Sequence, residues 1–162
     1  MKKKAFIFIL AFTLMLGFFA SRSMAATYSL SNLAGTWYIT GNLATLDDDN
    51  GDTYVGLYSL MYLPIKVSAA GAISSGGTGY GYNDGDTTAD VSLKATGGTL
   101  KISTTTGIVS GTIKIYYSGD GETGTVAAYI RYGVMNTTKN IVSGFMMIPS
   151  SLESGTFTAT KR

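Results

Sequence analysis

The sequence predicts an all-β protein, an antiparallel up-and-down barrel of about eight strands preceded by a signal-peptide helix. Short runs of β-branched and aromatic residues, separated by Gly, Asn and Asp, fill the chain after residue 26. No connection between these runs is long enough for the crossover helix that parallel strands need. Gly recurs before Thr, as expected of strands that coil into a small barrel. A β-sandwich is the alternative.

Residues 1–25 have the three parts of a cleavable secretory signal peptide. Three lysines at 2–4 are followed by the apolar run 5–20 and by a small-residue stretch that ends before Ala26. The apolar run is shorter than the roughly 20 residues of a membrane-spanning helix. A lipid anchor would need a cysteine, and the chain has none. We expect an exported protein, periplasmic or extracellular, that is not lipid-anchored and has no membrane span once the signal is removed.

Removal of the signal changes the charge of the chain. Four of the twelve basic residues lie within residues 1–25, which leaves eight basic against ten acidic residues and a net charge of −2 instead of +2. The remaining cations are scattered singly except for Lys161-Arg162, so we expect no basic patch and no nucleic-acid partner. Residues 26–162 are long enough for a single β domain, whose core must hold without disulfides.

The expected strands lie between segments with turn chemistry. Asn-Gly and Asp-Gly pairs at 50–51, 84–85 and 120–121 favour tight hairpins. The predicted strands are Gly35–Thr40, Tyr54–Val67, Ala72–Tyr82, Val91–Lys94, Thr99–Ser103, Ile108–Tyr117, Gly124–Met135, Ile141–Ile148 and Thr156–Thr160.

Two internal repeats also indicate hairpins. Residues 65–74 resemble residues 100–110, and each reads as a strand, a small-residue turn closed by Gly and a returning strand. A Gly-Thr pair followed by an apolar residue occurs five times, and its Gly lets a strand bend sharply. With a looser third copy at 136–144, the hairpin repeat has three imperfect units, which are few for a solenoid or propeller, so we predict repeated hairpins in one sheet. The Gly-Thr pairs begin at Gly35, Gly98, Gly111, Gly124 and Gly155.

Composition argues against catalysis. The chain has no His and no Cys, which excludes Ser-His-Asp and Cys-His catalysis and ordinary zinc sites. Its acidic residues lie mainly in turns, so no glycosidase-like carboxylate pair is expected. The acidic segment Asp47–Asp52 does not fit the EF-hand register and is expected to be a charged hairpin tip, with a looser calcium loop as the alternative. We predict that the protein is not an enzyme and uses no metal or cofactor.

Tyrosines gather on two of the predicted strands. The strand at 54–67 carries three of them on one face, while its opposite face is also apolar, and residues 80–82 carry a further pair. Tyrosine has an apolar ring and a polar tip, which suits ligand pockets and sugar-stacking surfaces. The alternative is that these are ordinary core and cross-strand aromatics. The candidate ligand-binding residues are Trp37, Tyr54, Tyr58, Tyr62, Tyr80 and Tyr82.

The segment Leu33-Ala34-Gly35-Thr36-Trp37-Tyr38-Ile39 places a Gly-x-Trp motif on the first strand of a predicted meander. In this the chain resembles the lipocalins and their calycin relatives. The resemblance implies an eight-stranded barrel with an interior for a small apolar ligand. It also implies that Trp37 closes one barrel end under a basic residue, either Arg131 or Arg162. The Gly-Thr-rich hairpins are similar to those of uncharacterised exported bacterial proteins, which suggest no function.

Two functions are consistent with these features. The first is binding of a small apolar or aromatic ligand inside the barrel, near Trp37 and the tyrosine face. The second is a structural or cell-surface interaction protein, such as an adhesin or glycan-binding protein. An interior cavity on the order of several hundred Å³ would favour the first, and a filled core with an exposed aromatic strip the second. An outer-membrane barrel is not expected, because segments such as 156–162 lack a lipid-facing apolar band.

Overall fold

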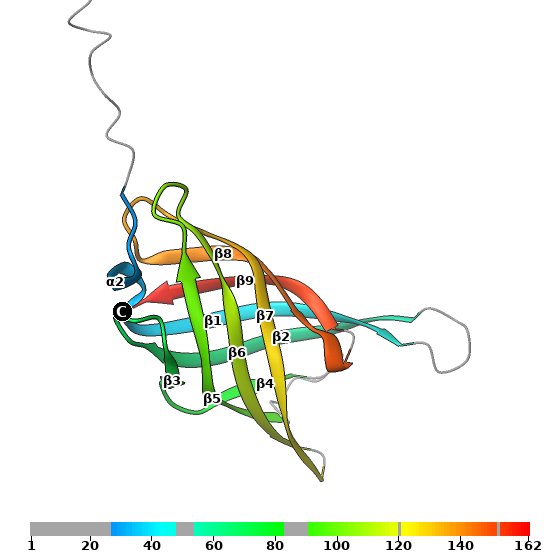
Figure 1. The fold of residues 1–162 in the computed structure, drawn as a ribbon. Helices are drawn as coiled ribbons and strands as arrows, with labels where there is room; N and C mark the ends of the chain where they lie inside the picture. The colour runs from blue at the N-terminus through cyan, green and yellow to red at the C-terminus, as the bar shows by residue number, and fades with distance from the viewer. Residues whose placement is uncertain (1–26, 48–53, 83–90, 120, 152) are drawn as a thin grey trace, which may run out of the picture.

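The computed structural model describes most of the chain after residue 26 (Figure 1). The predicted signal helix lies outside the described residues, as do residues 48–52 of the acidic segment. For residues 45–47, 54–60 and 151 only the backbone is described. The described ranges are 27–47, 54–82, 91–119, 121–151 and 153–162.

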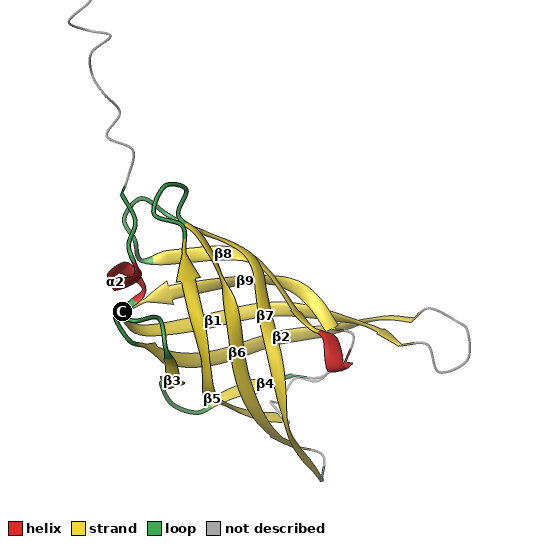
Figure 2. Cartoon of the chain, in the orientation of Figure 1, coloured by secondary structure: helices red, strands yellow, loops and turns green. Residues whose placement is uncertain are grey.

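Strands dominate the described chain, with two short helical segments (Figure 2). Among the described residues, no helix is long and apolar enough to cross a membrane. The elements are α2 (Leu30–Leu33), β1 (Gly35–Asp47), β2 (Tyr54–Val67), β3 (Ile73–Ser75), β4 (Gly79–Gly81), β5 (Val91–Ile102), β6 (Ile108–Gly119), β7 (Glu122–Met135), β8 (Ile141–Ile148), the 3-10 helix η1 (Pro149–Ser151) and β9 (Glu153–Lys161).

The strands close into an antiparallel eight-stranded barrel, in which β3 and β4 together take the place of one strand (Figure 1). Neighbours in the barrel are neighbours in the chain, and β1 completes the circle by pairing with both β2 and β9. The short strands β3 and β4 share one position, since β3 pairs with the end of β2 and β4 with its middle. The predicted up-and-down barrel is therefore confirmed, and the sandwich alternative is excluded by the closed sheet.

Several predicted strand boundaries are wrong. The two segments Val91–Lys94 and Thr99–Ser103 belong to one strand, β5, which continues through a bulge between Ala95 and Gly97. The predicted strand Ala72–Tyr82 is divided into β3 and β4. The first strand also runs seven residues beyond its predicted end at Thr40, to Asp47.

Two glycines of the Gly-Thr repeat explain how β5 and β6 approach so closely. Gly98 and Gly111 have φ values of +122° and +151°, a region that residues with a side chain rarely adopt. A β-carbon on Gly98 would collide with the carbonyl oxygen of Thr112, and one on Gly111 with that of Thr99. At these two positions the repeat has the strand-bending role predicted from the sequence.

The core fills the barrel interior with apolar side chains from all the long strands. Alternation decides the faces: on β2, Met61, Leu63 and Ile65 are buried inside, whereas Tyr62 and Lys66 point outward. Among the described residues, no polar or charged side chain is buried. The largest fully buried side chains are Leu33, Ile39, Leu63, Ile65, Val109, Ile113, Ile115, Met135 and Met146.

The segment before β1 closes one end of the barrel, here called the α2 end (Figure 1). Tyr28 is buried there, its hydroxyl donates to the Met135 carbonyl at 3.3 Å, and its ring occupies space that Gly107 leaves free. The Leu33 side chain of α2 joins the core. The C-terminus of β9 reaches the same end, where the backbone N–H of Arg162 donates to the Thr36 carbonyl at 3.2 Å.

Candidate ligand-binding surface

Trp37 lies inside the barrel at the α2 end, 2% exposed. Its indole Nε1 donates a 2.6 Å hydrogen bond to the carbonyl oxygen of Leu33. The basic side chain over the indole is Lys161, whose Nζ lies 5.8 Å from the ring centre and donates to the Asn32 carbonyl at 3.2 Å. The expected Arg131 and Arg162 pack instead over Tyr129 and Tyr38, because each arginine extends from the outer wall.

The space around Trp37 is too small for a ligand. Within the described part of the barrel, the cavity between Trp37 and Phe157 has a volume of about 20 Å³ and an entirely apolar lining. A volume of that size holds one water molecule at most. Trp37 therefore fills the barrel at the α2 end as part of the core.

Three of the predicted tyrosines lie together on the outer wall of the barrel. Tyr62 faces Tyr80 across the β2–β4 pairing, and Tyr82 follows β4. The structure separates this group from Trp37, which is inside. Tyr54 and Tyr58 belong to β2, but their side chains lie outside the described residues.

The tyrosine ladder, formed by Tyr38, Tyr62, Tyr80 and Tyr82, is an array of rings packed on one another. Tyr62 stacks on Tyr38 at 6.1 Å between ring centres and on Tyr80 at 5.0 Å, with interplanar angles of 21° and 27°. Tyr82 packs edge-on against Tyr80 at 5.6 Å, and Arg162 covers Tyr38 at 5.3 Å. Both faces of Tyr62 are therefore covered. Each such pair contributes about 0.5–1.5 kcal/mol to stability, so the ladder holds strands together and offers no free ring face at its centre.

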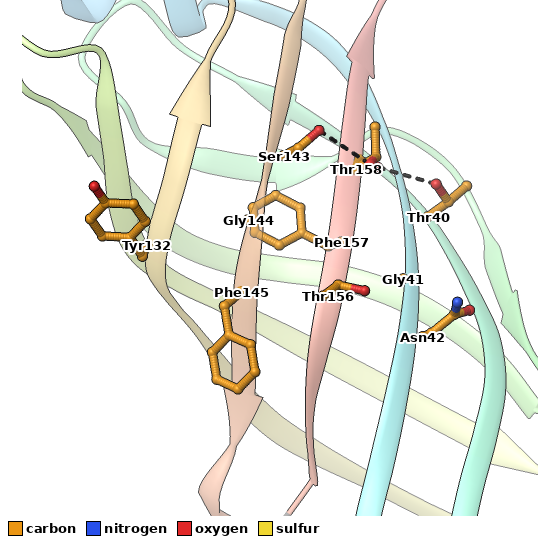
Figure 3. A pocket seen from close by; sticks show the side chains of 10 residues that line it. All are labelled: Thr40, Gly41, Asn42, Tyr132, Ser143, Gly144, Phe145, Thr156, Phe157 and Thr158. Atoms are coloured by element: carbon orange, nitrogen blue, oxygen red, sulfur yellow. Dashed lines mark hydrogen bonds between the residues drawn. The ribbon is translucent and has the colours of Figure 1, made fainter.

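A different part of the outer wall carries an open hollow of about 610 Å³ (Figure 3). We call it the outer hollow. It extends over β1, β9, β8 and β7, and among the described residues that line it none is charged. The lining residues are Thr40, Gly41, Asn42, Tyr132, Ser143, Gly144, Phe145, Thr156, Phe157 and Thr158.

Strand pairing arranges the outward side chains of the outer hollow in rows. One row joins Asn42, Thr156, Phe145 and Tyr132, in that order, across the four strands. The next row joins Thr40, Thr158 and Ser143.

The hydroxyl groups of this second row form hydrogen bonds within the row, one of them to a backbone carbonyl. Thr40 Oγ1 donates to the Thr158 carbonyl at 3.2 Å, and the hydroxyls of Ser143 and Thr158 are 3.2 Å apart (Figure 3). The outer hollow thus presents hydroxyl and amide groups on one side and aromatic rings on the other.

At the centre of the outer hollow, two paired glycines leave the backbone of the barrel wall without side chains. Gly144 pairs with Gly133 on one side and with Phe157 on the other. The Phe157 side chain is 3% exposed and its ring reaches beneath Gly144 (Figure 3). A β-carbon on Gly133 would lie 3.3 Å from the tip of that ring. An aromatic ring filling the space over glycines stabilises a strand that is otherwise weak.

Tyr132 and Phe145 are the exposed aromatic side chains of the outer hollow, with exposures of 56% and 43%. Within the described part of the chain, no other ring packs against either of them, in contrast to the tyrosine ladder. Sequence reasoning missed both. A signal for Phe145 was present, because the segment 141–148 is apolar on both faces, the same property that drew attention to 54–67.

The described side chains of the outer hollow are uncharged hydroxyls, an amide and aromatic rings, which can form hydrogen bonds and ring contacts. Within the described ranges, no three His, Cys, Asp or Glu side chains come together as metal ligands. No family model matches the chain, and no curated protein matches its sequence.

Proposed function

We propose that the protein is an exported, non-catalytic barrel that binds an uncharged, hydroxyl-rich ligand, such as a glycan, in its outer hollow. The observation that carries this proposal is the position of Tyr132 and Phe145. Their exposed rings stand beside a row of hydroxyl and amide groups that contains no charge.

The two halves of the outer hollow match the two kinds of surface on a sugar ring. The C–H face of a sugar is apolar and packs on an aromatic face, here that of Tyr132 or Phe145. The hydroxyls at the edge of a sugar need hydrogen-bonding groups, which Asn42, Thr156 and Thr158 offer directly or through water. Because none of the described side chains that line the hollow is charged, binding a neutral ligand there leaves no charged group of the wall without a partner.

We further propose that the barrel is lipocalin-like in architecture. The up-and-down strand order, the position of Trp37 on β1 above α2, and a basic residue, Lys161, over the indole support this. A lipocalin-like interior ligand has less support, since the cavity beside Trp37 is about 20 Å³. We therefore favour the outer wall as the binding surface.

A panel of neutral tetrasaccharides built from glucose, xylose, mannose or N-acetylglucosamine, assayed by isothermal titration calorimetry, tests the proposal. At least one should bind. Tyr132→Ala and Phe145→Ala should each weaken that binding by about 2- to 12-fold, the equivalent of one lost aromatic contact.

Tyr116→Ala is the matched control, because Tyr116 is also an exposed tyrosine of the outer wall but lies on β6, outside the outer hollow. It should bind the same sugar as the unmodified protein does. Binding of none of the neutral sugars, or equal weakening by all three substitutions, would contradict the proposal.

A further inference from the structure

The fold gathers cations that are scattered in the sequence. Lys66 and Lys101 are exposed near the ends of β2 and β5, Lys139 lies in the β7–β8 turn, and Lys161 and Arg162 end the chain. All five belong to the α2 end, since the antiparallel strands bring these strand ends and turns together. Five of the eight basic residues after residue 26 are therefore at one end of the barrel.

The acidic residues that the structure describes belong to the opposite end. All ten acidic residues of the chain fall in the sequence stretches 47–52, 84–90, 120–122 and 153. The strand ends beside these stretches pair with one another away from α2: Asp47 pairs with Tyr54, and Glu122 with Gly119. Within the described ranges, the α2 end consequently has five cations and no Asp or Glu side chain.

We propose that the α2 end docks on an anionic phospholipid surface. Charge complementarity with lipid phosphates is the first argument, because clusters of Lys and Arg bind such surfaces. The place where the chain enters the fold is the second. The described chain begins at the α2 end with Thr27 and Tyr28, so while the predicted export signal, residues 1–25, occupies the membrane this end faces the bilayer.

Exposed apolar side chains accompany the cations. Leu30 of α2 and Ile141 at the start of β8 are both exposed at the α2 end. Apolar side chains flanked by Lys and Arg are the combination that interfacial binding uses, since the former enter the headgroup region and the latter meet phosphates.

The described carboxylates, Glu122 and Glu153, do not cancel this attraction, because they are distant. The 14 residues of β2 extend about 46 Å at ~3.3 Å per residue, and a strand tilt of about 45° leaves roughly 33 Å along the barrel axis. The Debye length at physiological salt is only about 8 Å. A surface at the α2 end therefore interacts with the five cations and hardly at all with the opposite end, and the barrel stands upright on it.

Co-sedimentation of the exported, signal-processed protein with vesicles tests this. Phosphatidylcholine vesicles that contain phosphatidylglycerol should bind it, pure phosphatidylcholine vesicles should not, and added salt should release it. The double variant Lys66→Gln/Lys101→Gln should bind about 30-fold more weakly, because each of the two lysines contributes one attraction to a lipid headgroup.

The matched control is Lys94→Gln/Lys114→Gln, which removes the same charge from exposed positions on β5 and β6 nearer the middle of the wall. It should bind within about twofold of the unmodified protein. All four lysines are exposed, so thermal unfolding should be unchanged in both variants. Equal loss in the two double variants, equal binding to both vesicle types, or self-association of the chain in place of vesicle binding would overturn the proposal.

Discussion

Replacing Phe157 with alanine tests which face of β9 lies inside the barrel. The side chain is 3% exposed, and truncating a buried phenylalanine costs about 3–5 kcal/mol. The cost depends on whether neighbouring side chains can move into the space left behind. On the side of the barrel wall little can move in, because Gly41, Gly133 and Gly144 have no side chain, whereas Val142 and other apolar side chains line the interior beside the ring.

We therefore expect a loss of about 3–5 kcal/mol in the free energy of unfolding. A domain of this size has about 5–15 kcal/mol in total, so the variant should be marginally stable. Urea unfolding monitored by circular dichroism measures the change, with the midpoint and slope compared between proteins.

Phe145→Ala is the matched control for Phe157→Ala. Phe145 lies on the neighbouring strand β8 and pairs with Thr156, but its ring points outward. Substitution at such a surface position should cost no more than about 0.5 kcal/mol. A loss below about 2 kcal/mol for Phe157→Ala, or similar losses for both variants, would refute the assignment of faces and the role of the glycines.

Three further substitutions probe the closed end and the strand bend. Trp37→Phe leaves the buried Leu33 carbonyl without its donor and should cost about 1–3 kcal/mol in urea unfolding. Gly111→Val puts a side chain against the Thr99 carbonyl at a positive φ, so it should lower the melting temperature measured by calorimetry, for a cost of about 1–3 kcal/mol or more. Tyr28→Ala should speed hydrogen exchange in the adjoining 103–107 and 136–140 turns while β1 and β9 keep their protection. If the stability or exchange rate measured for one of these variants is unchanged, the contact that the substitution alters is contradicted.

The barrel could be predicted because its signals are local. Alternation, short connections and turn residues each concern a few neighbouring positions, and they sufficed for an antiparallel meander. The boundary within β5 could not be predicted in this way. Gly97 and Gly98 look like a turn in the sequence, whereas in the barrel they are a bulge and a bend held within the ladder by β6.

The outer hollow was harder to predict because a bulge reverses the alternation. Ile130 points into the barrel, so strict alternation would turn Tyr132 inward as well. A register shift between Ile130 and Tyr132 turns Tyr132 outward beside Phe145. The sequence analysis placed Tyr62 in one set of tyrosines and Tyr80 and Tyr82 in another, and the stacking that joins them could be seen only in three dimensions.

The strand topology alone is enough to predict which charged residues gather at each end of the barrel. Lys66, Lys101 and Lys139 are more than thirty residues apart in sequence, so no local window contains a basic patch. An up-and-down barrel brings every second connection to the same end. Once the strand order is known, the positions of charges can be assigned to ends by counting strands.

Amide chemical-shift mapping with the tightest-binding neutral tetrasaccharide tests the central claim, a binding surface on the outer wall, most directly. The account predicts shifts concentrated at Asn42, Phe145, Thr156 and Tyr132, with saturation of the same residues at a single affinity. Shifts concentrated instead at interior positions such as Ile65 would contradict it and would place the ligand inside the barrel.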